Sequence, residues 1–210
     1  MNKLRFKSLA TSYLGAILLT GATFTGACNS AAPPRSIGDS ANSASTERAQ
    51  KPVPARDQQA IESASSVQIT KLDGSAFKLS DFRGKVLVVD FWQTNCAPCV
   101  RLIPQLAELS KKYRDKGLEV VGLTSDDRAD QEKVVEFLKK RGADYTVGYE
   151  NQWLSSAFLR GTEDETGAAP IPQLFVISRE GRVVDHFIGE NPQRGIQDVE
   201  QSVIQQLSTR

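Results

Sequence analysis

Hydrophobic residues from residue 66 onward switch between strand-like and helix-like spacing. The nearly continuous apolar run 86–92 is typical of a central strand that is covered on both faces. Leu102, Leu106 and Leu109 follow at helical spacing, and Gly117 ends that helix. Such alternation predicts an α/β fold, a sheet with helices on both sides. Further strands are predicted at 67–71, 118–124, 144–148, 174–177 and 183–188, and further helices at 128–141, 153–159 and 199–207.

The composition fits one soluble domain with appendages. The 210 residues are 40% hydrophobic and 24% charged, which is the balance of a globular protein. A net charge of +1 argues against a nucleic-acid binder, whose surface would carry a marked basic excess. The sequence lacks the fingerprints of a nucleotide or flavin site, so no cofactor is predicted.

The first residues of the chain have the pattern of an export signal. Lys3, Arg5 and Lys7 form a basic start, and residues 9–19 form a short, mostly apolar run. This run is shorter than the roughly 20 residues that a membrane-spanning helix needs. We therefore expect a targeting segment here rather than a transmembrane helix.

The signal ends at Cys28 in a way that resembles the cleavage site of bacterial lipoproteins, in which the cysteine carries the lipid. Thr25 departs from the leucine usual there, so ordinary secretory cleavage and an uncleaved anchor are the alternatives. Residues 29–65 are rich in Ala, Ser, Pro and charge, which predicts a flexible tether. We expect a signal at 1–28, this tether, and a folded domain at 66–210 that is exported and membrane-anchored.

Two of the three cysteines are close together in the sequence. Cys96 and Cys99 would close a very small loop, which constrains the unfolded chain too little to be a structural staple. If Cys28 carries lipid, no second cysteine pair is left to complete a four-cysteine zinc site. Redox chemistry is therefore the favoured role of the pair.

Cys96 and Cys99 lie where the predicted central strand ends and a helix begins. Free backbone amides and the helix dipole at such a terminus lower the pKa of a cysteine below its free value of about 8.5. Cys96, at the exposed end, is predicted to be the attacking thiolate, and Cys99, one turn further in, the resolving thiol. Pro98 suits the first helical turn, where no backbone donor is needed.

The stretch 88–99, Val-Val-Asp-Phe-Trp-Gln-Thr-Asn-Cys-Ala-Pro-Cys, is followed by Pro104. This pattern resembles the thioredoxin superfamily, and most closely its exported, membrane-tethered disulfide reductases of the TlpA and ResA type, over residues 67–207. The resemblance implies a thioredoxin-like three-layer fold with a central mixed sheet. It also implies reduction of client proteins, apocytochrome among them, with electrons from a membrane thiol-disulfide donor. Pro104 matches the proline that kinks the family's active-site helix.

The resemblance implies roles for further residues. Ile171-Pro172 matches the cis-proline turn that faces the cysteines, the backbone of Ile171 pairing with substrate, and Pro170 is the competing position. Asp90 matches the buried aspartate of cytosolic thioredoxins, where burial raises its pKa so that it can take the proton of the resolving thiol. TlpA-type proteins more often have Asn there, so a solvated strand-end carboxylate is the alternative. Trp92 is expected against the active-site turn beside substrate, or filling the core.

One residue beside the cysteines departs from the family pattern, and one loop has two interpretations. Asn95 stands where the family usually has Trp directly before the first cysteine, which predicts a more open surface and a different choice of partner. The acidic loop 161–169 is either a rim that recognises partners or a solvated loop.

Two other functions are compatible with the same residues. The two cysteines and His186, the only histidine, could form the copper site of a carrier, although copper-delivery proteins of this superfamily normally space their cysteines four apart. A thiol peroxidase would use Thr94, two residues before the first cysteine, but the proline that precedes such sites is missing. A disulfide reductase remains the leading hypothesis.

Overall fold

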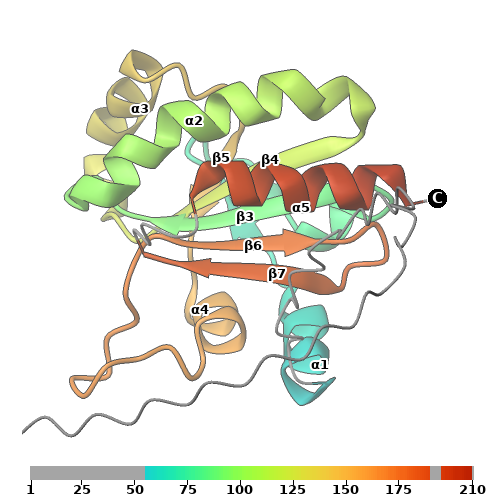
Figure 1. The fold of residues 1–210 in the computed structure, drawn as a ribbon. Coiled ribbons are helices and arrows are strands. Elements are labelled where there is room, and N and C mark those ends of the chain that lie inside the picture. Colours follow the sequence, from blue (N-terminus) through green and yellow to red (C-terminus); the bar gives the residue numbers. More distant parts are fainter. Residues whose placement is uncertain (1–54, 190–194, 210) are drawn as a thin grey trace, which may run out of the picture. The chain divides into compact units, whose positions relative to one another are not determined.

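A five-stranded mixed sheet forms the middle of the folded unit (Figure 1). The computed structural model of the protein describes residues 55–189 and 195–209, all of which belong to the unit Glu47–Arg210. Across the sheet the strands follow the order β5-β4-β3-β6-β7. Their bounds are β3 Val86–Trp92, β4 Leu118–Thr124, β5 Thr146–Tyr149, β6 Gln173–Ile177 and β7 Val183–Ile188.

β3 is the central strand, and each of its 7 residues is buried. It pairs in parallel with β4, which pairs in parallel with β5. On its other side it pairs antiparallel with β6, which forms a hairpin with β7. Because Trp92 is opposite Thr124 in the register, β3 and β4 end side by side, and the loops that follow them begin together.

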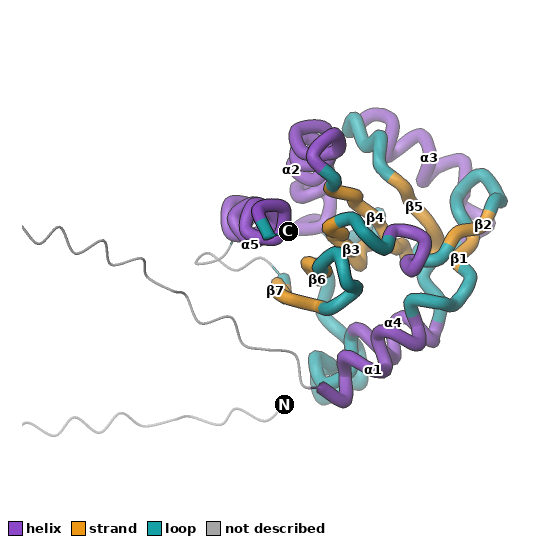
Figure 2. Tube along the Cα trace, turned by 90° about the vertical axis from the view of Figure 1, so that its right-hand side faces the viewer, coloured by secondary structure: helices purple, strands orange, loops and turns teal. Residues whose placement is uncertain are grey.

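Helices cover both faces of the sheet, so the unit has three layers, as Figures 1 and 2 both show. One face carries α2 (Ala97–Tyr113), α3 (Gln131–Lys140) and α5 (Ile196–Ser208), and the other α1 (Ala55–Ala64) and α4 (Gln152–Phe158). A separate hairpin consists of β1 (Ile69–Thr70) and β2 (Ala76–Phe77). The 3-10 segments are η1 (Leu79–Phe82), η2 (Arg114–Lys116) and η3 (Arg128–Asp130).

Alternate side chains of β3 enter two separate hydrophobic cores. Trp92 packs with Cys99 in the core beneath α2, α3 and α5. Phe91 points to the opposite face, where its ring centroid lies 5.7 Å from that of Phe158 in α4. Because side chains alternate along a strand, Asp90 shares the face of Trp92 and therefore faces the α2 layer.

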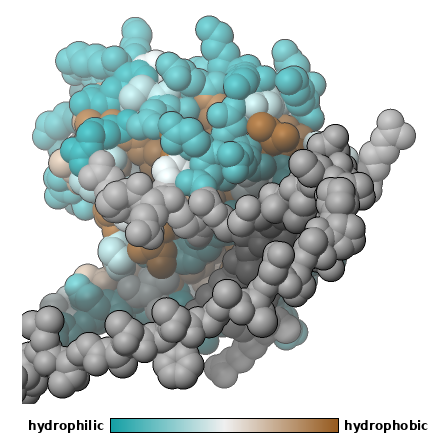
Figure 3. Space-filling view, viewed as in Figure 1, coloured by the Kyte–Doolittle hydropathy of each residue, from teal (hydrophilic) through white to brown (hydrophobic). Residues whose placement is uncertain are grey.

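The outer surface of the helical layer formed by α2 and α5 is mostly hydrophilic in the view of Figure 3. Exposed positions of α2 include Arg101, Gln105, Glu108 and Lys111, as expected of a helix with one face toward water. Within residues 55–189 and 195–209, none of the helices has the length and apolar character that crossing a membrane requires.

The structure confirms the predicted α/β architecture with helices on both faces of a mixed sheet, but several bounds differ. The first strand is only β1, since the chain turns back at Asp73 and Gly74 to form β2. The helix expected at 128–141 begins with the 3-10 segment η3, and its α-helical part is α3. The expected signal, with Cys28, lies outside the described residues.

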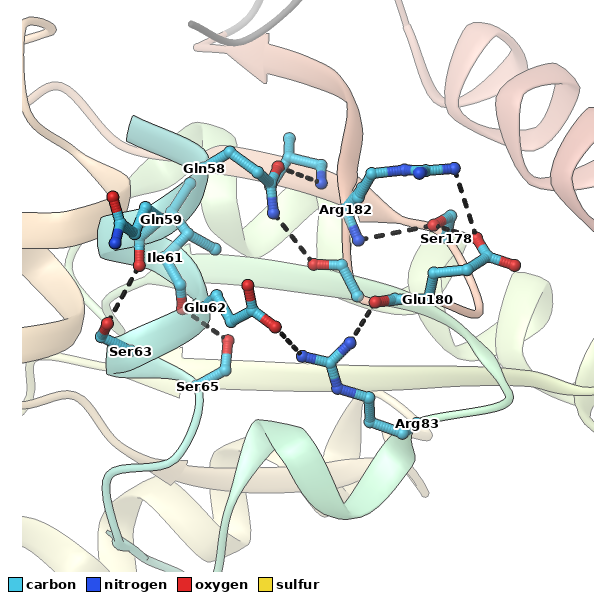
Figure 4. Close-up of polar contacts among 12 residues, drawn as sticks. Gln58, Gln59, Ile61, Glu62, Ser63, Ser65, Arg83, Ser178, Glu180 and Arg182 are labelled. Carbon is cyan, nitrogen blue, oxygen red and sulfur yellow. Dashed lines mark hydrogen bonds and ion pairs between the residues drawn. The ribbon is translucent and has the colours of Figure 1, made fainter. Parts of the chain in front are cut away.

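The folded part begins earlier than the expected boundary at residue 66, because α1 occupies residues 55–64. Ile61 is only 2% exposed and belongs to the core shared with α4. Polar contacts add to this packing: Gln58 bonds to the β6–β7 hairpin, and Glu62 pairs with Arg83 (Figure 4). The expected tether is therefore wrong for residues 55–65, since the buried Ile61 and Ala64 and side-chain hydrogen bonds dock this polar helix. The rest of the expected tether, up to residue 54, lies outside the described residues.

Candidate active site

Cys96 and Cys99 form a disulfide at the junction of β3 and α2. Cys96 is the N-cap of α2 and has an extended backbone, and its Sγ accepts a hydrogen bond from the backbone N–H of Cys99 at 3.2 Å. Pro98 occupies the first turn of the helix, as predicted. A backbone amide that can stabilise a thiolate on Cys96 is therefore in place at the positive end of the helix dipole.

The two sulfur-bearing side chains differ in their access to solvent. Cys99 is 0% exposed and packs in the core beneath α2. Cys96 is half-buried, and Asn95 directly before it is exposed. A protein disulfide can therefore approach Cys96 from solvent, whereas Cys99 is reached only through Cys96.

The backbone of the segment before β6 faces the disulfide. The Ile171–Pro172 peptide bond is cis, so Pro172 rather than Pro170 occupies the predicted cis-proline position. The Sγ of Cys96 lies 3.7 Å from the carbonyl oxygen of Ile171. The carbonyl oxygen of Pro170 instead accepts a hydrogen bond from Gln173 Nε2 at 2.8 Å.

Asp90 is a buried acid on the same side of the sheet as Cys99. Its side chain is 0% exposed, and neither carboxylate oxygen has a hydrogen-bond partner among the described residues. Burial raises the pKa of Asp90 to about 8 from its usual 3.8. The alternative of a solvated strand-end carboxylate is therefore wrong, because Asp90 lies in the middle of a strand that both helical layers cover.

Trp92 lies beneath the active-site turn rather than beside a substrate. It is 1% exposed, and its ring stacks on Phe137 of α3 with 6.0 Å between the ring centroids. The structure thus favours the core-filling interpretation, since an indole enclosed between β3 and α3 has no surface to offer a bound client.

Four further side-chain polar groups are buried without a hydrogen-bond partner in the described part of the chain, and two of them are Trp92 Nε1 and the hydroxyl of Tyr145. Gly122, opposite Asp90 on β4, lies between these rings, because a Cβ there would be 2.9 Å from Trp92 Nε1 and 3.3 Å from Tyr145 Cε2. Burial, and then the nearby Asp90, raise the pKa of Tyr145 well above its usual value. Asp90, Trp92 and Tyr145 are therefore three buried polar side chains on the side of the sheet that carries Cys99.

Thr94 is engaged in a hydrogen bond that the sequence did not indicate. Its hydroxyl donates to Oδ1 of Asp126 at 2.6 Å, and the acceptor belongs to the loop after β4. The hydroxyl that a thiol peroxidase would direct at its cysteine is therefore bound to a carboxylate, and Cys96 is paired with a second cysteine. Both observations favour dithiol chemistry over peroxidase chemistry.

His186 is bound on the opposite face of the sheet from Cys99. Its ring stacks on Phe175 with 4.1 Å between centroids, and Nε2 lies 2.8 Å from Oε1 of Gln173. Phe175 belongs to the core under α1 and α4, whereas Cys99 belongs to the core under α2. In residues 55–189 and 195–209, no three His, Cys, Asp or Glu side chains are grouped to hold a metal ion, so the copper alternative lacks its third ligand.

The acidic loop 161–169 is exposed and is ordered by its own hydrogen bonds. Asp164 Oδ1 accepts from the backbone N–H and the hydroxyl of Thr166, and Thr162 Oγ1 accepts from Gln173 Nε2 at 2.8 Å. Gln173 is fully buried and also binds Pro170. It therefore joins the acidic loop to the segment that faces the disulfide, a role that the sequence did not reveal.

Sequence comparison agrees with this geometry. The profile of the Redoxin family matches residues 48–203, which is more than half of the chain. The protein belongs to the Redoxin family. This Redoxin protein is 33% identical over 122 residues to the thiol-disulfide oxidoreductase ResA of Bacillus thuringiensis (strain Al Hakam), a match that covers 58% of its own chain. The match covers 65% of that relative, just under two thirds of its length.

Further relatives extend the comparison. A ResA of Bacillus cereus is 30% identical over 137 residues, which are 64% of this Redoxin chain and 73% of the relative. Among solved structures, a thioredoxin-family thiol:disulfide interchange protein of Chlorobium tepidum TLS is similar, with a TM-score of 0.58 and 29% identity. That match covers 69% of this chain and 95% of the other. The thioredoxin-like fold expected from the sequence is therefore confirmed.

Proposed function

We propose that the protein is a thiol-disulfide oxidoreductase that reduces disulfides of client proteins outside the cytoplasm. The observation that carries this proposal is the asymmetric pair at the start of α2, a half-buried Cys96 disulfide-bonded to a fully buried Cys99. Two relatives named as thiol-disulfide oxidoreductases and a structural neighbour named as a thiol:disulfide interchange protein support it.

In the proposed reaction, the thiolate of Cys96 attacks one sulfur of a client disulfide. A mixed disulfide forms, and the other client sulfur leaves as a thiolate. Cys99 then loses its proton and attacks the Cys96 sulfur, which releases the second client thiolate and forms the Cys96–Cys99 disulfide. The client gains two electrons and the protein loses two, so a thiol donor must reduce the pair before the next cycle.

Asp90 is the proposed acceptor of the Cys99 proton. It is a titratable group on the same side of β3 as Cys99, and burial raises its pKa to about 8, close to that of a thiol. An acceptor whose pKa matches that of the donor can take up and release the proton with little cost. Resolution of the mixed disulfide is therefore expected to slow when Asp90 cannot ionise.

The client is proposed to bind along the backbone of Ile171, whose carbonyl oxygen lies 3.7 Å from the Cys96 sulfur. Beside it, a groove formed by α2, β6, β7 and α5 combines apolar side chains with one positive charge. Pro98, Pro172, Leu174 and Phe187 contribute the apolar surface, and Arg101 contributes the charge. An extended client segment could pair its main chain with Ile171 and place its side chains in this groove. Main-chain pairing gives affinity without requiring one particular client sequence.

We also propose that lipid on Cys28 anchors the protein to a membrane, and that a membrane thiol-disulfide protein supplies the electrons. The basic start, the short apolar run and the small residues before Cys28 support this. Labelling cells with a palmitate analogue tests the anchor. Label that is lost in Cys28→Ser supports it, and label that persists there contradicts it.

The redox proposal is tested by a midpoint potential and by trapping. Equilibration with dithiothreitol buffers should give a reversible two-electron couple near the thioredoxin value of about −270 mV or lower, while a value near −120 mV would indicate an oxidant instead. Cys99→Ser should accumulate mixed disulfides with client proteins through Cys96, because the resolving thiol is missing. Cys96→Ser is the matched control and should trap none; equal trapping by both variants would contradict the assignment.

A further inference from the structure

Asp126 binds the segment that connects β3 to Cys96. Its carboxylate accepts the backbone N–H of Thr94, at 3.0 Å to Oδ2 and 3.3 Å to Oδ1, and the Thr94 hydroxyl at 2.6 Å to Oδ1. Oδ2 also accepts the hydroxyl of Thr124 at 2.7 Å, the last residue of β4. One carboxylate therefore joins the loops after two adjacent strands.

Thr94 lies within the turn that ends at the reactive cysteine. The backbone N–H of Cys96 donates to the carbonyl oxygen of Gln93 at 3.2 Å and closes this turn. At the start of the turn, the N–H of Ser125 donates to the carbonyl oxygen of Trp92 at 3.2 Å. Backbone bonds thus fix the two ends of the turn, and Asp126 is the group that binds its middle.

We infer that Asp126 is a positioning residue of the redox site, which acts through Thr94 to hold the Cys96 sulfur at the N-terminus of α2. The inference rests on the proposed oxidoreductase function and names a residue that this function needs. The Cys96 sulfur must stay within reach of the Cys99 amide, now 3.2 Å away, for the thiolate to be stabilised and correctly oriented. A turn that is free to shift would weaken both effects.

Replacing Asp126 removes both its negative charge and its hydrogen bonds to Thr94, and the two losses change the reaction rate of Cys96 in opposite directions. This difference makes the inference testable. A negative charge near Cys96 disfavours the thiolate, so removal of the charge alone would make Cys96 more reactive at low pH. Loss of positioning would instead lower the rate even at high pH, where Cys96 is fully ionised. The rate at the high-pH plateau therefore reports on position and not on ionisation.

The experiment measures how fast the reduced, full-length protein reacts with a small aromatic disulfide, dithiobis-nitrobenzoate, from pH 5 to pH 10. Asp126→Ala removes the carboxylate bonds to Thr94, and Thr94→Val removes the hydroxyl bond but keeps the backbone one. We expect plateau rates reduced about tenfold in Asp126→Ala and several-fold in Thr94→Val. Thr94→Ser, which retains the hydroxyl, should restore the rate to within about twofold of the wild type.

Asp127→Asn is the matched control, because Asp127 is the adjacent exposed carboxylate and its bond is local, to the backbone N–H of Ala129 at 2.9 Å. It removes the same charge, and its plateau should stay within about twofold of the wild type. The double variant Thr94→Val/Asp126→Ala should be no slower than Asp126→Ala, because both changes break the same contact. Thr94→Val keeps the inference testable if Asp126→Ala does not fold.

An unchanged or raised plateau rate in Asp126→Ala, or in Thr94→Val where Asp126→Ala does not fold, would overturn the inference. A double variant in which the two single effects multiply would overturn it too. These results differ from a failure of the proposed function. If the wild type has no reversible Cys96–Cys99 couple, the function itself is wrong. If the wild-type couple is reversible and the variants react normally, only the role of Asp126 is wrong.

Discussion

The sulfur of Cys96 and the carbonyl oxygen of Ile171 lie 3.7 Å apart, although 75 residues separate them in the sequence. The antiparallel pairing of β3 with β6 brings them together, because Phe91 near the end of β3 is opposite Gln173 at the start of β6. On its other side, the Cys96 sulfur faces the amide of Cys99 at 3.2 Å. The reactive sulfur is thus held between a backbone donor and a backbone segment able to bind a client.

This placement predicts that the two cysteines differ strongly in reactivity once the disulfide is reduced. A short pulse of N-ethylmaleimide should alkylate Cys96 roughly tenfold faster than Cys99 or more, because Cys99 is fully buried and reacts only when the fold opens. Mass spectrometry of the peptides gives both rates. Cys96→Ser and Cys99→Ser each leave one thiol of the pair, whose peptide is followed separately from that of Cys28, and equal rates for the two remaining thiols would contradict the assigned roles.

The buried Asp90 predicts a pH-dependent stability. Burial raises its pKa to about 8, so the folded protein keeps a proton that the unfolded chain, with a pKa of 3.8, releases. The unfolded state binds fewer protons across this window, so the free energy of unfolding falls by up to about 1.4 kcal/mol per pH unit between about pH 4 and pH 8. Asp90→Asn removes this loss, because an amide does not ionise.

Urea unfolding of the oxidised protein from pH 4 to pH 9 checks this prediction. The stability advantage of Asp90→Asn over the wild type should grow between pH 4 and pH 8 and level off above that. Asp115→Asn, a change of the same kind at an exposed aspartate, should show no such growth. An Asp90→Asn advantage that does not change with pH would mean that the Asp90 carboxyl is ionised in the folded protein.

The packing around Gly122 leaves no room for a side chain at this position of β4. A Cβ at this position would lie 2.9 Å from Trp92 Nε1, closer than real Cβ atoms come. Gly122→Ala should therefore lower the free energy of unfolding by about 1–3 kcal/mol and shift the fluorescence of Trp92. In the control Gly195→Ala, the nearest atom to the new Cβ is the flexible Gln197 Oε1 at 3.1 Å, so a small effect is expected. Equal losses in both variants would contradict the packing argument.

Local sequence signals were sufficient to predict the fold and the centre of the site. The apolar run 86–92 is strand β3, and the cysteines directly after it cap α2, as the junction of strand and helix implied. The apolar neighbours of Asp90 in that run favoured burial but left a solvated strand end as the alternative, and the structure decides for burial. These features depend on residues close together in the chain.

What the sequence did not reveal depends on contacts between distant segments. Thr94 and Asp126 are 32 residues apart, and only the parallel pairing of β3 and β4 brings their loops together. Gln173 likewise connects distant segments. The β6–β7 hairpin brings His186 to its Oε1, and the chain before β6 brings Thr162 of the acidic loop to its Nε2. Trp92 stayed open between the substrate side and the core, because aromatic character does not say which layer a ring enters.

The docking of α1 gives the last prediction, because this helix has few hydrophobic residues of its own. The side-chain amide of Gln58 bridges the β6–β7 hairpin: Nε2 donates to the carbonyl oxygen of Gly181 at 3.1 Å, and Oε1 accepts the N–H of Val183 at 2.9 Å (Figure 4). Gln58→Ala should lower the free energy of unfolding by about 1–3 kcal/mol, since it leaves a partly buried backbone donor without its partner.

Gln59→Ala is the matched control on the same helix, because Gln59 is exposed and its carbonyl oxygen, not its side chain, binds Ser63. It should change stability by no more than about 0.5 kcal/mol. Hydrogen exchange adds a local measurement: in Gln58→Ala, the amides of α1 and of Val183 should exchange faster while those of β3 remain protected. If both variants exchanged alike, the other contacts of α1, Ile61 packing and the Glu62–Arg83 pair among them, would hold it, and the folded boundary would not depend on the Gln58 bridge.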